Sequence, residues 1–416
     1  MKFIFLMLLF LNLSYAQDEV IGKIVFSNTK KMNVDFLKKI IKTKEGQSLD
    51  STQIMSDIQV LNRLNGISKA EFDIQLIENN KYEVNYTVTE NHSLIPILSV
   101  WTTNEIGAYR IGLYEYNFLG KNNTLGGFYQ YNNYNSFGLN FSSPQFFSSK
   151  YGFEFNTQKL VSKEPVFFDN TSANYIYSNT AAETVGVYQY NAKNQFKLGI
   201  TLFNEKYKYI EGAMNTSIPQ NLNLNKKLIK AAYTYDNLNY DYYIVSGFKN
   251  NFFFQYVISE NNFQEKFLIG WNDFLYYKRI GNRGNWASRL RLGLASNNES
   301  PFSPFSVDNN LNIRGVGNII DRGTGTIVLN TEFRKTLFEK NWFVLQGNAF
   351  VDSGTWRNPG GDFSDFGNSK NFRVYSGLGI RFIHKTIFNA VFRLDYGYGI
   401  TKNASQGVVF GIGQYF

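Results

Sequence analysis

The 416-residue chain contains no cysteine. Disulfide bonds therefore cannot hold the fold together, and a thiolate metal site is excluded. A chain of this size without disulfides must be stabilised by a large core or by an extended ladder of backbone hydrogen bonds. The absence of cysteine thus excludes a small disulfide-stabilised extracellular scaffold.

Residues and motifs for catalysis are also scarce. The chain has two histidines, His92 and His384, and neither has a serine and an aspartate at a recognisable spacing. The sequence lacks a GxSxG nucleophile motif and an HExxH zinc motif. We therefore expect no enzymatic activity, no cofactor and no metal site.

Long apolar runs are missing beyond the N-terminus. After Leu13 no stretch approaches 18 consecutive apolar residues, so no transmembrane helix is expected. Proline is scarce, with 7 residues against 34 glycines, whereas aromatic residues make up 17% of the chain. This composition favours a chain dominated by β-strands that are joined by polar turns.

Residues 1–16 are predicted to be a signal peptide. A charged Lys2 is followed by an apolar run to Leu13 and by the small-x-small sequence SYA before Gln17. We therefore expect the mature chain to begin near Gln17 and to leave the cytoplasm. The net charge of +9 is scattered along the sequence. An exported chain with scattered charge is not expected to bind nucleic acid.

Residues 17–92 are predicted to form a small α+β domain. Asn33 and Asp50 are the expected N-caps of two amphipathic helices. Gln53 follows Asp50 by three residues, as in a capping box. The predicted order of elements is strand, helix, helix, strand, strand.

The first strand after these helices has a clear period of two. Phe72, Ile74 and Leu76 alternate with polar residues, and a second alternating strand follows an Asn-Asn turn. One face of this pair is therefore expected to pack on the helices.

From residue 93 to residue 416 the helical period does not return. About sixteen strand-like segments follow one another, separated by turns rich in Asn and Ser. Between residues 342 and 354, for example, Phe343 and Leu345 share one face, and Asp352 lies on the opposite face. An apolar face opposite a charged face, repeated strand after strand, is typical of a transmembrane antiparallel β-barrel with a polar interior.

A soluble β-sandwich would also alternate, so three further features favour the barrel. They are the signal peptide, the number of long strands, and the final aromatic residue, Phe416. We therefore predict a mostly β fold: an outer-membrane barrel of about 16 strands, residues 93–416, preceded by the domain of residues 17–92.

The last segment, QGVVFGIGQYF, is expected to be the closing strand of the barrel. It puts Phe410 and Phe416 on one apolar face that should contact lipid. Gly411 and Gly413 weaken a strand because glycine packs nothing. These glycines fit a need for space inside a crowded lumen.

Arg314 and Gly315 lie in a polar loop where nothing nearby neutralises the arginine. The next strands place Glu332 and Asp352 on their inward faces. A loop that folds into the lumen would bring the guanidinium against both carboxylates. Because an arginine–carboxylate pair is strong and directional in a confined site, we predict that this contact holds the loop inside.

Several segments resemble the BamA/TamA outer-membrane assembly superfamily, the surface-antigen barrels. "NIRGVG" looks like the Arg-Gly motif of its sixth extracellular loop, although Val316 stands where the family usually has an aromatic residue. The other similar segments are "NTEFR" (330–334), "FVDSGTW" (350–356), "NFLGKNNTLGGFYQY", "FSSPQFF" and "FGIGQYF". Residues 20–92 are similar to the periplasmic POTRA domain of this family, including the "EGQSLD" run before the second helix.

The resemblance implies a non-enzymatic factor of the outer membrane, with its POTRA-like domain in the periplasm. It also implies a weak seam between the first and last of sixteen strands, and Gly411 and Gly413 fit that seam as well. Such a factor would contact membrane lipids and insert or translocate unfolded β-barrel or secreted client proteins, with periplasmic or lipoprotein accessory subunits as further partners. The strand of Phe72, Ile74 and Leu76 would be an edge strand to which a client adds a strand.

Other functions stay open at this point. A dedicated exporter of a single partner protein would carry the same motifs. A passive channel would need neither an N-terminal domain nor a loop held inside. A lipase-like relative would need the nucleophile motif that the sequence lacks.

Overall fold

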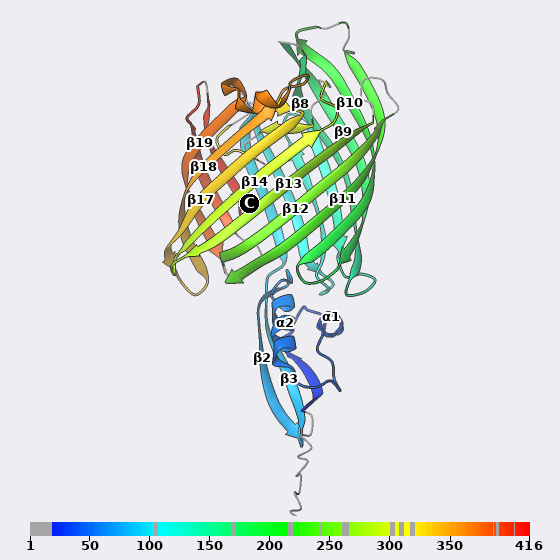
Figure 1. The fold of residues 1–416 in the computed structure, drawn as a ribbon, viewed down its shortest axis with the longest axis vertical. Coiled ribbons are helices and arrows are strands. Elements are labelled where there is room, and N and C mark those ends of the chain that lie inside the picture. Colours follow the sequence, from blue (N-terminus) through cyan, green and yellow to red (C-terminus); the bar gives the residue numbers. More distant parts are fainter. Residues whose placement is uncertain are drawn as a thin grey trace, which may run out of the picture.

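The computed structural model describes residues 19–416 except 104–105, 169–170, 215, 217–218, 242, 260–265, 300–303, 308–311, 317–320, 386, 388–390 and 403. The signal peptide predicted for residues 1–16 lies outside the described residues. A small α+β domain lies below one end of a large barrel (Figure 1).

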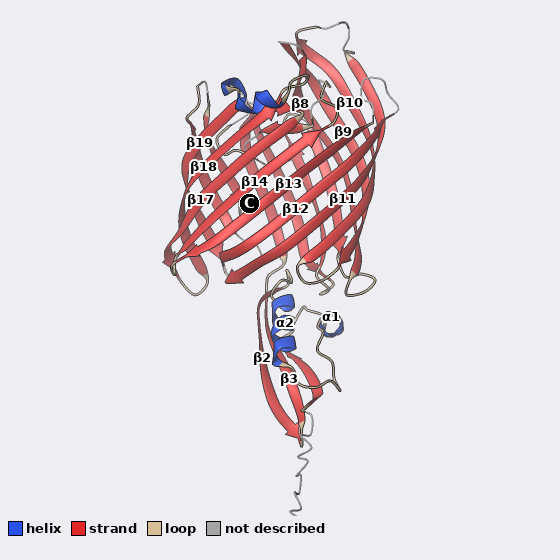
Figure 2. Ribbon diagram, viewed as in Figure 1, coloured by secondary structure: helices blue, strands red, loops and turns tan. Residues whose placement is uncertain are grey.

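The small domain is a three-stranded sheet with two helices packed on it (Figure 2). Its elements are β1 (Val20–Ser27), α1 (Val34–Ile40), α2 (Ser51–Leu61), β2 (Ile67–Glu78) and β3 (Lys81–Glu90). The sheet order is β1-β3-β2, with β1 parallel and β2 antiparallel to the central β3. Both β1 and β2 are therefore edge strands.

Both helices begin at the predicted caps. The side chain of Asn33 accepts a hydrogen bond from the backbone of Phe36, and Asp50 accepts from the backbone N–H groups of Thr52 and Gln53. These caps satisfy N–H groups that have no partner within the helix. No helix among the described residues is long and apolar enough to cross a bilayer.

A buried carboxylate connects the two helices to the sheet. Asp57 of α2 accepts hydrogen bonds from the backbone N–H groups of Lys42 (2.8 Å) and Thr43 (2.9 Å). It also accepts a hydrogen bond from the Tyr86 hydroxyl at 3.3 Å. Burial raises the pKa of Tyr86 above its usual value, so the hydroxyl stays protonated and can donate. Asp57 therefore fixes the segment between the helices against the sheet.

Sixteen antiparallel strands form the closed barrel, which confirms the predicted fold class. They are β4 (Leu94–Thr103), β5 (Ile106–Phe118), β6 (Asn123–Tyr131), β7 (Asn135–Ser143), β8 (Tyr151–Phe168), β9 (Thr171–Gln189), β10 (Asn194–Gly212), β11 (Asn221–Asp241), β12 (Ile244–Ser259), β13 (Phe267–Ile280), β14 (Gly284–Ala295), β17 (Gly325–Glu339), β18 (Phe343–Arg357), β19 (Phe372–His384), β20 (Val391–Gly399) and β21 (Gln406–Ile412).

Four short elements lie in loops at the end of the barrel remote from the small domain and are not part of the barrel wall. Two short strands, β15 (Phe305–Val307) and β16 (Asp321–Gly323), pair with each other between β14 and β17. Two 3₁₀ turns, η1 (Phe363–Gly367) and η2 (Ser369–Asn371), lie between β18 and β19. The sequence pattern did not predict these turns, because a single 3₁₀ turn is too short to show a helical period.

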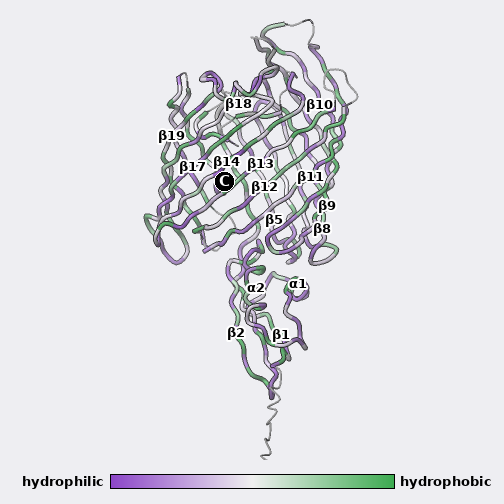
Figure 3. Tube along the Cα trace, viewed as in Figure 1, coloured by the Kyte–Doolittle hydropathy of each residue, from purple (hydrophilic) through white to green (hydrophobic). Residues whose placement is uncertain are grey.

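Apolar and polar residues alternate along the barrel strands (Figure 3). Exposure shows that the apolar residues point outward and the polar residues point inward. On β19, Leu378 and Ile380 point outward and are 69% and 52% exposed, whereas Arg381 is fully buried. The lumen is thus filled by charged and polar side chains, and the apolar surface lies outside. This is the reverse of a soluble β-sheet protein and is what a bilayer requires.

The barrel closes between its last and first strands, β21 and β4. Their register contains one residue pair, Phe410 with Val100, whereas β21 forms seven pairs with β20 on its other side. Because so few backbone groups are paired there, this seam is the weakest part of the described ladder.

The predicted closing strand was too long by four residues. β21 ends at Ile412, and Gly413 adopts a left-handed backbone conformation with φ of 94°, which glycine tolerates without strain. Phe416 was expected on the outer face, but it packs beside the inward residues Leu238, Leu275 and Tyr277. The turn at Gly413 directs the last residues into the lumen and ends the strand alternation on which that prediction depended.

The predicted boundary between residues 92 and 93 stays a prediction. Strand β3 ends at Glu90 and strand β4 begins at Leu94, so both strand ends lie within two residues of it.

The small domain contacts turns at the near end of the barrel. The backbone N–H of Asn33 donates to the carbonyl of Gly120 at 3.0 Å, and that of Asn65 donates to the side chain of Asn122 at 2.9 Å.

We predict that Asp57→Ala destabilises the small domain. The substitution leaves the buried N–H groups of Lys42 and Thr43 without an acceptor, and each such group costs about 1–3 kcal/mol. Limited proteolysis of the full chain should cleave the N-terminal domain faster, while the barrel stays resistant. Glu71→Ala is the control, because Glu71 makes only an exposed surface ion pair. Equal protection of the Asp57 variant and the wild type would contradict the prediction.

Candidate functional site: an arginine held in the barrel lumen

Arg314 lies in the long connection between β14 and β17, and this connection enters the lumen. Its neighbours Ile313 and Val316 are fully buried. They belong to an apolar cluster with Val307, Val328, Trp356 and Tyr375. Val316, the departure from the family motif, is therefore packed on the barrel wall.

Asp352 is the main partner of Arg314. Two guanidinium nitrogens of Arg314 donate to the two carboxylate oxygens of Asp352, Nε to Oδ2 at 2.8 Å and Nη2 to Oδ1 at 2.9 Å. The backbone N–H of Arg314 also donates to Oδ2 at 3.0 Å. This bidentate geometry fixes both the side chain and the backbone of the loop.

Glu332 accepts from three arginines at once. Arg314 donates through Nη1 to Glu332 Oε2 at 2.6 Å, and Arg381 donates through Nη2 to both carboxylate oxygens at 3.0 Å. Arg334 of the same strand also donates to Glu332. Further along the lumen, Asp395 lies 3.8 Å from Nη1 of Arg314.

All three members of the central contact are removed from solvent. The side chains of Arg314, Glu332 and Asp352 are 0% exposed. Burial of an ionised group is costly unless a partner and hydrogen bonds compensate it. In this site every guanidinium nitrogen of Arg314 donates to a carboxylate, so the charge is compensated.

Aromatic rings cover the guanidinium group. The central carbon of the Arg314 guanidinium lies 3.6 Å from the ring centroid of Phe350 and 4.4 Å from that of Tyr415. Such cation–π contacts add attraction where water is excluded. Tyr415 comes from the segment that Gly413 directs inward, so the end of the chain and the loop meet at Arg314.

Gly315 packs directly against the backbone of β20. A Cβ atom at Gly315 would lie 2.6 Å from the carbonyl oxygen of Gly397, and the φ of Gly315 is 92°. Only glycine fits this position without displacing β20. The hydroxyl of Ser405 donates to the carbonyl of Gly315 at 3.0 Å and also to that of Val316.

The structure thus brings together the four residues that the sequence pattern placed in the loop contact: Arg314, Gly315, Glu332 and Asp352. Sequence reasoning assigned no role in the contact to Gly397, Ser405 and Tyr415. The one available signal was a glycine at an inward position of a strand. This signal identifies Gly397 but not the loop residue that Gly397 contacts.

The other predicted residues lie elsewhere. Phe72 and Ile74 pack against the core of the small domain, and Leu76, which is 63% exposed, lies near the far end of β2. Gly411 faces Arg393, and a Cβ atom there would lie 2.8 Å from a guanidinium nitrogen. Gly411 therefore makes room for an inward arginine at the closing strand.

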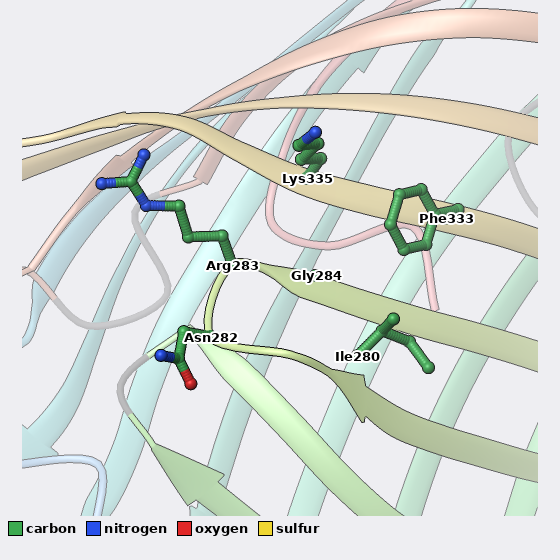
Figure 4. Close-up of a pocket in the computed structure, with 6 residues that line it drawn as sticks. All are labelled: Ile280, Asn282, Arg283, Gly284, Phe333 and Lys335. Atoms are coloured by element: carbon green, nitrogen blue, oxygen red, sulfur yellow. The ribbon is translucent and has the colours of Figure 1, made fainter.

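No cluster of three metal-ligating side chains occurs among the described residues. A small cavity lies between the β13–β14 turn and β17 (Figure 4), lined by Ile280, Asn282, Arg283, Gly284, Phe333 and Lys335. Its lining contains Lys335 but no carboxylate, histidine or hydroxyl side chain that could act as a base for this amine.

Comparison with known proteins follows the two parts of the structure. Residues 19–91 match the POTRA family model, described as the surface antigen variable number repeat. A search of curated proteins returns no match. The domain below the barrel is therefore a POTRA domain.

Solved structures share the whole architecture. BamA from Haemophilus ducreyi lacking POTRA domains 1–3 is 16% identical, with a TM-score of 0.58, over 95% of this chain and 84% of that chain. CdiB from Acinetobacter baumannii is 12% identical, with a TM-score of 0.62, over 96% and 74% of the two chains. CdiB from Escherichia coli is 12% identical, with a TM-score of 0.65, over 95% and 76%.

These matches confirm the resemblance to the BamA/TamA-type superfamily that the sequence motifs indicated. At these identities the solved structures establish a common fold, and the POTRA match places the same kind of domain before the barrel.

We predict that Arg314→Ala releases the loop from the lumen. Asp352 loses its bidentate partner, and breaking a buried ion pair costs about 3–5 kcal/mol. The barrel ladder is unchanged, so the expected result is a higher single-channel conductance in planar bilayers with normal heat-modifiable mobility on gels. Arg314→Lys should restore the wild-type conductance only in part, because an ammonium group cannot bridge two carboxylates.

A double-mutant cycle of Arg314→Ala and Asp352→Asn, measured by thermal unfolding in detergent, checks the pairing. The two effects should be strongly non-additive. Arg279→Ala is the control, since the pair of Arg279 with Asp241 is exposed. Independent, additive effects of the two lumen substitutions would contradict the contact.

Proposed function

We propose that the chain is a non-enzymatic outer-membrane barrel that inserts or translocates client proteins, with its POTRA domain in the periplasm. The observation that carries this proposal is the seam between β21 and β4, which is held by one residue pair. The apolar outer face supports a membrane location, because lipid-exposed strands need apolar side chains and a closed ladder.

The seam offers a route into the bilayer. An intact barrel has no free strand edge, but separation of β21 from β4 would expose two. The cost of that separation is small compared with any other strand pair, since Phe410 and Val100 are the one pair of residues in register there. A client strand could then pair with either edge.

The POTRA domain offers a second edge. One side of β2 pairs with β3, and the other side faces no strand among the described residues. The strand is 12 residues long, and its distal part, with Leu76 and Ile77, is exposed. An extended segment of a client can add to such an edge through backbone hydrogen bonds.

The loop contact argues against a passive channel. A loop that is held inside the lumen occupies part of the path of a freely diffusing solute, and a diffusion pore needs no N-terminal domain. The contact of Arg314 with Asp352 and Glu332 instead supports a barrel whose interior changes state.

A dedicated exporter of one partner protein is the alternative. The same seam, loop and POTRA edge would serve a single client whose strand pairs with the opened seam before the client leaves through the lumen. The number of client proteins that depend on the barrel separates these two functions.

A cross-link across the seam tests the proposal. Because the chain has no cysteine, Val100→Cys with Phe410→Cys introduces one possible disulfide, and antiparallel partners lie within the Cα distance of about 4.4–6.8 Å that a disulfide needs. Oxidation should abolish client insertion or export in cells that carry this variant as their sole copy, and reductant should restore it.

The control pair is Tyr396→Cys with Val408→Cys, which joins β20 to β21 where seven residue pairs already hold them together. Oxidation of this pair should leave activity unchanged. An inventory of outer-membrane proteins after oxidation of the seam pair then separates the functions: loss of many barrels indicates general assembly, and loss of one protein indicates export. Full activity with the seam cross-linked would reject the proposal.

We also predict that one of two neighbouring proline substitutions in β2 impairs client handling without unfolding the domain. Successive backbone N–H groups of a strand point to opposite edges, and proline removes the N–H. Of Asp73→Pro and Ile74→Pro, one therefore alters the free edge and the other breaks a hydrogen bond to β3. Proteolysis of the full chain identifies the folded variant. Normal client insertion or export by that variant would remove strand addition at β2 from the mechanism.

A further inference from the structure

Lysines gather on the outer face of one sector of the barrel, at the end remote from the POTRA domain. The strands β8 to β11 are among the longest in the barrel and rise above their neighbours (Figure 1). The exposed lysines on their outer faces are Lys159 and Lys163 of β8, Lys206 and Lys208 of β10, and Lys227 of β11.

The lysines begin where the apolar surface ends. On β10 the outward residues Phe196, Leu198, Ile200 and Leu202 are all strongly exposed. Further along β10, toward the end remote from the POTRA domain, the next outward residues are Asn204, Lys206 and Lys208. The change from apolar to basic side chains therefore falls along one strand, at the expected upper margin of the bilayer.

Strand β9 lies between the lysine-bearing strands β8 and β10 and carries two short hydroxyl side chains on its outer face at this level. Its outward residues Ser178 and Thr180 lie in register with Lys206 and with Lys159, respectively. Since neighbouring strands are about 4.8 Å apart, β8 and β10 are about 10 Å apart, and lysine side chains from both can reach over β9. Hydroxyl groups below and ammonium groups on both sides make a suitable cradle for a phosphate.

The charge of this face is almost uncompensated. Among the described residues of β8 to β11, one outward carboxylate occurs at this end, Glu211, and it pairs with Lys163. The inward lysines of the same strands are different, because Lys226 and Lys230 pair with Glu205 and Glu183 in the lumen. The remaining four outward lysines are free to bind an external anion.

At the end remote from the POTRA domain, no other sector of the described barrel wall carries such a group. At the same end, the outward residues near the tops of β6, β13, β14 and β20 are Tyr131, Leu268, Leu294 and Tyr398. At this end the basic surface is therefore confined to one sector, so it does not simply reflect the positive net charge of the chain.

We propose that Lys159, Lys206, Lys208 and Lys227 bind the phosphate groups of an anionic lipid in the outer leaflet. This inference rests on the outer-membrane location in the proposed function. Each lysine near a negatively charged lipid surface contributes attraction, and the apolar rows below hold the acyl chains of the same lipid. A phosphorylated glycolipid fits both surfaces at once.

The test uses the purified full chain in detergent, titrated with bis-phosphorylated lipid A and followed by native mass spectrometry. The variant K159Q/K206Q/K208Q/K227Q should bind this lipid at least tenfold more weakly than the wild type. Lipid A without its phosphates should bind the wild type as weakly as it binds the variant. Inorganic phosphate at the same concentration should not displace the lipid, because it lacks acyl chains.

The control variant K193Q/K278Q/K335Q/K340Q removes four exposed lysines at the end near the POTRA domain, so it has the same net charge. It should bind lipid A like the wild type. Equal weakening by the two variants would mean that net charge alone attracts the lipid, and unchanged binding by the first variant would mean that these lysines do not contact it. Either result overturns the proposal.

Heat-modifiable mobility on gels confirms that each variant is folded. The assay measures lipid binding by the purified protein and needs no client. A failure of lipid binding is therefore distinct from a failure of client insertion, which the seam cross-link reports.

Discussion

The buried ion pair of Arg314 with Asp352 is the interaction on which the interior of this barrel depends. A guanidinium group without solvent must be compensated, and Asp352 does so with both carboxylate oxygens and also binds the Arg314 backbone. The loop is therefore held in the lumen at its tip. The contact of Gly315 with Gly397 and the hydrogen bonds from Ser405 follow from that position.

The same arginine connects the loop with the end of the chain. Tyr415 packs on the Arg314 guanidinium, and it follows directly after the closing strand β21. Strand β21 is joined to β4 by one residue pair. The loop and the weakest part of the wall therefore share a contact, although they are distant in sequence.

Local signals in the sequence predicted the local structure well. Asn33 and Asp50 begin the two helices, because a cap depends on residues within one turn. Strand alternation separated outward from inward residues for the same reason. The prediction for Phe416 was wrong because alternation assumes that a strand continues, and the left-handed turn at Gly413 ends it. The roles of Gly397 and Ser405 were not predictable, since each meets a loop more than 80 residues away.

The sequence by itself therefore determined that the chain is a barrel with an apolar outside, a charged inside and a small α+β domain before it. A period of two with one apolar face, repeated over about sixteen segments, leaves few other folds for a long chain. Only the tertiary structure decided that Arg334 and Arg381 also donate to Glu332, and that Phe410 and Val100 are the one pair in register at the seam among the described residues. Those contacts depend on the register and tilt of all sixteen strands together, which no single segment specifies.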